Sequence, residues 1–144
     1  MTATLIDRLI EDGDADVVGA ETIGAYLDAA PETVTMLFFT GDPAKKLETP
    51  DLAVVLREIK RGRPDDLRLA VVDRADEAKL MKPYGVPMLP STVFMAGRRR
   101  LGVAPKVKDW AFYERAVPDF IREARSPAPP PLPNGADAGG AVHV

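Results

Sequence analysis

The residue types that carry most nucleophilic and metal chemistry are nearly absent from this chain. It contains no cysteine, and its single histidine is His143, in a Pro- and Gly-rich segment. Without a thiolate there is neither a sulfur nucleophile nor thiol–disulfide exchange. A Ser–His pair and a histidine-based metal site on a folded domain are excluded in the same way. We interpret His143 as incidental rather than as a metal ligand.

Carboxylate clusters are the remaining candidates for acid–base chemistry. Asp65 and Asp66 are adjacent, and Asp73 precedes Asp76 and Glu77. Paired carboxylates can act as general acid and base, but these spacings are typical of turns and helix starts, where the side chains face solvent. The chain also lacks a P-loop motif and a G-x-G-x-x-G motif. We therefore predict no enzyme, no cofactor and no metal site.

Charge and hydropathy exclude two further classes of partner. The 144 residues include 22 acidic and 19 basic side chains, for a formal net charge of -3. A net acidic chain offers no general attraction to nucleic acids or anionic lipids. No apolar run approaches the ~18 residues that span a bilayer, and the first residues do not have the form of a signal peptide. We expect a cytoplasmic protein with no nucleic-acid partner and no membrane span.

Helix and strand patterns alternate along the sequence and predict an α/β fold. Any functional site must be positioned by these elements. Apolar residues recur at helical spacing over residues 5–10, and Thr22 is placed to cap a second helix that Pro31 ends. Nearly continuous apolar runs predict strands that are buried on both faces; they are residues 34–39, 67–72 and 91–95. This alternation implies right-handed crossovers and a mixed sheet covered by helices on both faces.

Two longer helices complete the pattern. Thr49-Pro50-Asp51 has the form of a helix start, with a capping hydroxyl, a proline in the first turn and an acid near the positive end of the helix dipole. An apolar stripe from Tyr113 to Ala124 predicts the last helix. Pro118 lies inside this stripe and has no N–H to donate, so we expect a kink or a late start there.

The composition changes at Ser126. Residues 126–144 are rich in Pro, Gly and Ala and have too few large apolar side chains to offset the entropy of ordering. We therefore predict one domain over residues 1–125 and a disordered tail over residues 126–144.

Removal of Ser126 to Val144 should leave the melting temperature nearly unchanged, because the last apolar stripe ends at Ala124. Thermal unfolding of the full-length and truncated chains, followed by circular dichroism, measures this. A drop of more than ~4 °C, which corresponds to about 1 kcal/mol for a domain of this size, would show that the tail packs on the domain.

The order of the predicted elements resembles the thioredoxin superfamily. The strand before Asp73 is followed by a short helix ending in Tyr84-Gly85-Val86, and Leu89-Pro90 directly precedes the strand 91–95. In that superfamily such a proline is the cis-proline beside the redox site. The resemblance implies a thioredoxin-like three-layer sandwich, in which helices flank a mixed central β-sheet. It also implies a cis bond before Pro90 and a hairpin turn at residues 96–98.

The same resemblance implies a scaffold without its redox chemistry. An alignment anchored on Pro50 places Asp42 and Lys45 at the positions of the two redox cysteines. Met36 falls where thioredoxins keep a buried acid that serves the exchange. We interpret Asp42 and Lys45 as solvated loop residues rather than as a catalytic pair. The apolar Met36 fits a thioredoxin-like fold that does not carry out thiol–disulfide exchange.

A narrower resemblance combines the cysteine loss with several short segments. They are Thr40-Gly41-Asp42-Pro43, Leu56-Arg57-Glu58-Ile59, Ala70-Val71-Val72-Asp73 and Tyr84-Gly85-Val86 before Pro90. In this order they resemble the HyaE/HupG family of hydrogenase expression proteins, over residues 5–124. The resemblance implies a non-catalytic accessory role in the assembly of an uptake nickel–iron hydrogenase. The implied partners are the small-subunit precursor, bound at its twin-arginine signal region before export, and other assembly factors.

The partner-binding residues that we predict are Asp42, Lys45, Met88, Leu89 and Pro90. An extended peptide can pair with the free backbone strip beside a cis-proline. Met88, Leu89 and Pro90 would supply apolar contacts, and acids such as Asp42 would meet a basic peptide; Asp73 and Asp76 are the other acids considered for this contact.

The run Arg98-Arg99-Arg100 concentrates positive charge on the predicted hairpin. We interpret it as charge that keeps an edge strand unpaired; the alternative is a docking site for an acidic assembly factor.

Two other functions of the protein also stay open. One is a general redox-inactive thioredoxin-like adaptor, which gene neighbourhood would discriminate, and the other is a glutathione-type enzyme without cysteine, which a glutathione-binding assay would discriminate.

Overall fold

Five strands form one mixed sheet in the computed structural model, which describes residues 4–126. They are β1 (Asp16–Val18), β2 (Val34–Phe39), β3 (Leu67–Val72), β4 (Ser91–Ala96) and β5 (Arg99–Pro105). Their spatial order is β1-β3-β2-β4-β5. β3 pairs in parallel with β1 and β2, whereas β4 pairs antiparallel with β2 and β5. β1 and β5 are therefore the edges of the sheet.

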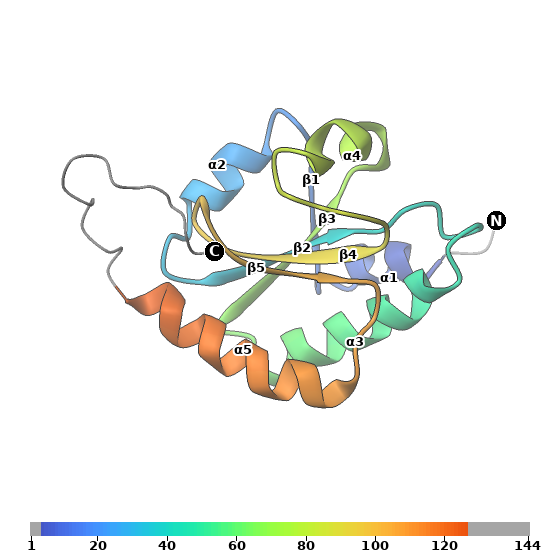
Figure 1. The fold of residues 1–144 in the computed structure, drawn as a ribbon. Coiled ribbons are helices and arrows are strands. Elements are labelled where there is room, and N and C mark those ends of the chain that lie inside the picture. The colour runs from blue at the N-terminus through green and yellow to red at the C-terminus, as the bar shows by residue number, and fades with distance from the viewer. Residues whose placement is uncertain (1–3, 127–144) are drawn as a thin grey trace.

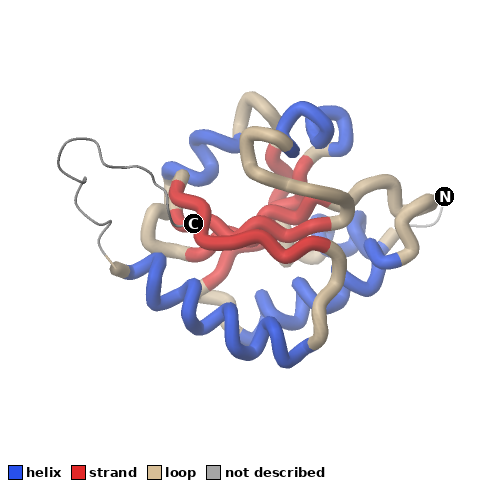
Figure 2. Tube along the Cα trace, viewed as in Figure 1, coloured by secondary structure: helices blue, strands red, loops and turns tan. Residues whose placement is uncertain are grey.

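Helices cover both faces of this sheet (Figures 1 and 2). α1 (Leu5–Glu11), α3 (Glu48–Gly62) and α5 (Trp110–Arg125) pack on one face. α2 (Ile23–Asp28) and α4 (Arg74–Met81) pack on the other. The predicted three-layer α/β sandwich is confirmed. No helix within residues 4–126 is long and apolar enough to cross a membrane.

The side chains of β2 divide the core into its two halves. Met36 and Phe38 pack with α1, α3 and α5, and Leu37 and Phe39 pack with α2 and α4. All four are fully buried. A strand covered on both faces needs apolar residues at successive positions, which explains the unbroken apolar run in the sequence. The two predictions about backbone geometry are also confirmed, since the Leu89–Pro90 bond is cis and a glycine with positive φ forms the β4–β5 turn.

Two predicted capping hydrogen bonds are absent. Thr22 is the N-cap residue of α2, as predicted, but its hydroxyl does not cap the helix; it accepts a hydrogen bond from the Gly19 N–H at 2.9 Å, on the chain entering the helix. Thr49 lies inside the first turn of α3, which begins at Glu48, and its buried hydroxyl donates to the Thr40 carbonyl at 2.6 Å. Both hydroxyls meet a nearby backbone group that competes with the helix end.

The sequence predicts a kink or a late start of the last helix at Pro118, and the late start is wrong. α5 runs from Trp110 to Arg125 with Pro118 inside it. Buried residues lie on both sides of the proline, at Tyr113 and Val117 before it and at Ile121 and Ala124 after it. Their packing on the sheet outweighs the backbone hydrogen bond that the proline removes.

Ser126, one residue beyond the predicted domain boundary, is the C-cap of α5. Its N–H donates to the Glu123 carbonyl, and its hydroxyl donates to the Arg122 carbonyl at 3.1 Å. The rest of the predicted tail, residues 127–144, lies outside the described residues.

The arginine run at the β4–β5 turn is held by contacts that neither interpretation of the sequence included. Arg98 donates two hydrogen bonds of 2.8 Å to Asp28 at the end of α2. Arg99 donates to the Glu123 carbonyl at 3.1 Å, at the C-terminal end of α5, where this carbonyl also accepts the Ser126 N–H. β5 is an edge strand, as predicted, but Arg98 in the turn and Arg99 at the start of β5 fasten the hairpin to helices on opposite faces of the sheet.

Candidate functional site

Three segments meet at one end of the sheet. The loop 40–46 follows β2, the first turn of α4 follows β3, and the segment 86–90 precedes β4. β2 and β3 are parallel and end side by side, and the last residue of β2, Phe39, pairs with Ser91 at the start of β4. In α/β sheets this carboxyl end of parallel strands is where binding sites form. We take these three segments as the candidate site.

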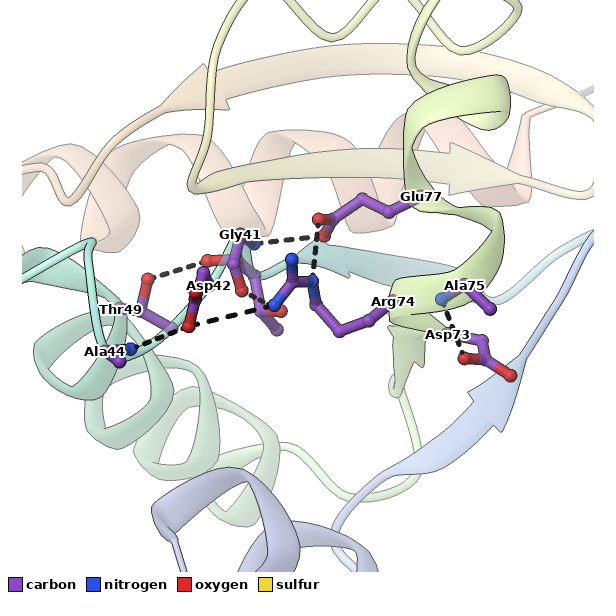
Figure 3. Close-up of polar contacts among 9 residues, drawn as sticks. Gly41, Asp42, Ala44, Thr49, Asp73, Arg74, Ala75 and Glu77 are labelled. Atoms are coloured by element: carbon purple, nitrogen blue, oxygen red, sulfur yellow. Dashed lines mark hydrogen bonds and ion pairs between the residues drawn. The ribbon is translucent and has the colours of Figure 1, made fainter.

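A buried carboxylate holds the first two segments together (Figure 3). Glu77 is only 3% exposed. One of its oxygens accepts a hydrogen bond from the Gly41 N–H at 3.0 Å, and the other lies 3.3 Å from the Arg74 guanidinium. A carboxylate is buried at acceptable cost only when it is paired and hydrogen-bonded. The prediction that this glutamate faces solvent is therefore wrong.

Arg74 extends this contact to the loop. Its guanidinium also lies 3.9 Å from an oxygen of Asp42, so it stands between Glu77 and Asp42 (Figure 3). Asp42 in turn stabilises the loop, because its side chain accepts the Ala44 N–H at 3.0 Å and its carbonyl accepts the Lys45 N–H at 2.9 Å. The Lys45 side chain is exposed and makes no ion pair within residues 4–126. Asp42 and Lys45 are thus neighbours on one turn that do not pair through their side chains.

The loop and the segment 86–90 touch at Gly41. This glycine has φ of 67°, and a Cβ atom there would lie 3.1 Å from the Leu89 Cβ and 3.0 Å from the Lys46 Cγ. A residue with a side chain would need an unfavourable backbone conformation and would push Leu89 away. The absence of a side chain at this position therefore allows the loop to approach Leu89 closely.

The segment 86–90 offers unpaired backbone and apolar surface. Met88 is 42% exposed, Leu89 is half-buried and Pro90 is buried. The Met88 carbonyl accepts the Ser91 hydroxyl at 2.6 Å, and the Pro90 carbonyl accepts the Lys106 N–H at 2.8 Å. The N–H groups of Met88 and Leu89, by contrast, have no hydrogen-bond partner among the described residues. They remain available to an extended ligand.

The two other acids considered from the sequence have structural partners. Asp73 caps α4, since its side chain accepts the Ala75 N–H at 3.1 Å (Figure 3). Asp76 accepts the Ala20 N–H at 2.7 Å, and this hydrogen bond lowers the pKa of its carboxyl. Asp73 lies at the end of the sheet beside Arg74, whereas the carboxylate of Asp76 binds the backbone of the segment that follows β1.

The carboxylates of the site make structural contacts. The most buried of them, Glu77, has both oxygens occupied by Gly41 and Arg74 and so acts as an anchor for the loop. Residues 4–126 hold no group of three or more His, Cys, Asp or Glu side chains that could bind a metal ion.

Sequence reasoning missed Arg74 and Glu77 as site residues. The available signal was the i,i+3 spacing of Glu77 and Leu80, which places both on the inner face of α4.

Comparison with known proteins supports the same reading of fold and family. The family model described as "Hydrogenase-1 expression protein HyaE" matches residues 5–113. The hydrogenase expression/formation protein HoxO of Azotobacter vinelandii is 36% identical over 121 residues, covering 84% of this chain and 80% of that protein. HupG of Rhizobium leguminosarum bv. viciae, also a hydrogenase expression/formation protein, is 37% identical, covering 84% and 83%.

Solved structures support the same family and the same fold. A crystal structure of the putative hydrogenase expression/formation protein HupG from Rhodopseudomonas palustris has a TM-score of 0.53 and 33% identity, covering 78% of this chain and 99% of that one. A mutant thioredoxin from Halobacterium salinarum has a TM-score of 0.59 at 19% identity, covering 90% and 100%, which shows that the fold is thioredoxin-like. Because the family model spans most of the chain and relatives above 30% identity align along most of its length, this chain belongs to the HyaE family of hydrogenase expression/formation proteins.

Proposed function

We propose that this protein is a non-catalytic assembly factor that binds the small-subunit precursor of an uptake nickel–iron hydrogenase, through the twin-arginine signal region, in the cytoplasm before export. Its membership in a family of hydrogenase expression/formation proteins supports a role in making a hydrogenase. Its site supports binding rather than catalysis, because the chain has no cysteine and its buried glutamate is fully engaged.

One observation carries the binding proposal. The unpaired N–H groups of Met88 and Leu89 lie beside the exposed side chain of Met88, at an end of the sheet that Asp42 also borders. This combination suits an extended peptide with apolar and basic residues. Arg74 lies between Asp42 and Glu77 and offsets part of the acidic charge. Apolar and backbone contacts therefore supply most of the affinity, and the exposed acid supplies selectivity, since an exposed ion pair contributes little.

The experiment compares the precursor with the mature small subunit that lacks its signal region, by calorimetry or pull-down. Leu89→Asp should weaken precursor binding about tenfold or more, because it places a charge in the apolar contact. Asp42→Asn should weaken it less than about fivefold, as expected for one exposed ion pair.

Val54→Asp is the matched control, because Val54 is a partly exposed apolar residue on α3, outside the site. It should bind the precursor like the unmodified protein. Equal binding of the precursor and the signal-less subunit would refute the signal-region proposal. Equal binding of unrelated signal-less proteins would favour a general adaptor.

A further inference from the structure

A groove between α3 and α5 lies apart from the candidate site. Its floor is apolar and consists of Ile59, Tyr113 and Val117, and its volume is about 270 Å³. It runs beside the last turns of α3, whereas the candidate site contacts the first turn of that helix through Thr49. The separation along the helix is roughly 15 Å at 1.5 Å per residue. The two surfaces can therefore be occupied and tested independently.

The groove exposes the chain's only tryptophan. Trp110 begins α5, lines the groove and is 49% exposed. An indole that is half in contact with protein and half in water presents a rigid apolar face at low entropic cost, and such residues are enriched where proteins bind each other. Its π face also attracts guanidinium and ammonium groups.

Acceptors with negative charge border this aromatic face. Glu58 of α3 and Glu114 of α5 both line the groove and are exposed, and neither makes an ion pair within residues 4–126. The groove's one lining cation, Arg63, lies 3.8 Å from an oxygen of Asp66.

We propose that this groove binds a cationic peptide segment of a partner protein. An arginine or lysine of the partner stacks on Trp110 and pairs with Glu58 and Glu114, while a neighbouring apolar side chain contacts Ile59 and Val117. This goes beyond the proposed function, since it assigns the protein a second docking surface on the opposite end of α3.

The test uses the tryptophan as its own reporter, in the full chain. The probe is a capped hexapeptide with two arginines and two leucines, and the comparison peptide has glutamates in place of the arginines. The arginine peptide should shift the Trp110 emission in a saturable manner, and the glutamate peptide should not. Raising the salt concentration should weaken binding, because the groove carboxylates are exposed. The double variant Glu58→Gln/Glu114→Gln should lower the affinity about threefold to tenfold, as expected for two exposed charge contacts.

Glu11→Gln/Glu21→Gln is the matched control, because it makes the same change in net charge at two exposed glutamates outside the groove. It should leave the affinity unchanged. Calorimetry of Trp110→Leu, which removes the reporter, should show loss of binding. The proposal is overturned if the arginine peptide gives no saturable signal, if both double variants weaken binding equally, or if Trp110 emission depends on protein concentration alone, which would identify the groove as a contact between two copies of this chain.

Discussion

Replacement of Met36 by aspartate should lower the free energy of unfolding by about 3–5 kcal/mol, a large part of the roughly 5–15 kcal/mol that stabilises a typical domain. Met36 is fully buried in the apolar half of the core under α1, α3 and α5, where no cationic side chain is buried with it. The variant restores the acid expected at this position from the thioredoxin resemblance, without polar surroundings to receive it. Urea unfolding followed by circular dichroism measures the loss.

Met36→Leu is the control for this prediction, and it should cost less than about 1.5 kcal/mol because it conserves volume and polarity. The aspartate defect should also depend on pH. Burial raises the pKa of an unpaired carboxyl in the folded state, so the penalty is full above that raised pKa and shrinks as the pH falls toward the unfolded value of about 3.9. If the aspartate and leucine variants are equally stable at pH 7, the apolar core described around Met36 is wrong.

Glu77→Ala should lower the free energy of unfolding by about 1–3 kcal/mol, because the buried N–H of Gly41 loses its acceptor. Glu77→Gln retains an oxygen for that N–H and should lose less. The measurement is again urea unfolding, with amide exchange at Gly41 as a local readout that should accelerate in the alanine variant. Glu114→Ala changes an exposed glutamate on α5 and should stay within about 0.5 kcal/mol of the unmodified protein. A Glu77→Ala variant as stable as Glu114→Ala would show that Glu77 does not anchor the loop.

The layers of the fold were predictable from sequence because each element carries a local signal. The strand Val34–Phe39 is apolar at every position but one, which is typical of a strand covered on both faces. The helix caps were less predictable, because a hydroxyl such as that of Thr49 has two possible partners. Its choice of the Thr40 carbonyl depends on where β2 ends in space, and the sequence near Thr49 does not contain that information.

The site was predictable only as far as the thioredoxin resemblance reached. The resemblance predicted that Asp42 and Leu89 lie at the same end of the sheet. In the structure Gly41, which precedes Asp42, lies close to Leu89. The resemblance did not reveal Glu77, because a glutamate in the first turn of a helix is ordinarily solvated and favoured by the helix dipole alone. Burial of this glutamate follows from its partners Gly41 and Arg74, of which Gly41 lies 36 residues earlier in the chain.

The strand order has a consequence for how the chain folds as it is synthesised. β1 and β2 do not pair with each other; both pair with β3, which begins at Leu67. A nascent chain that has not yet reached Leu67 therefore contains two strands with no partner between them, and β2 exposes an apolar face on each side. Such segments are prone to aggregate while unpaired. The β4–β5 hairpin, by contrast, pairs as soon as its turn is made. Arrival of β3 is thus the step at which the first half of the chain becomes able to form a sheet.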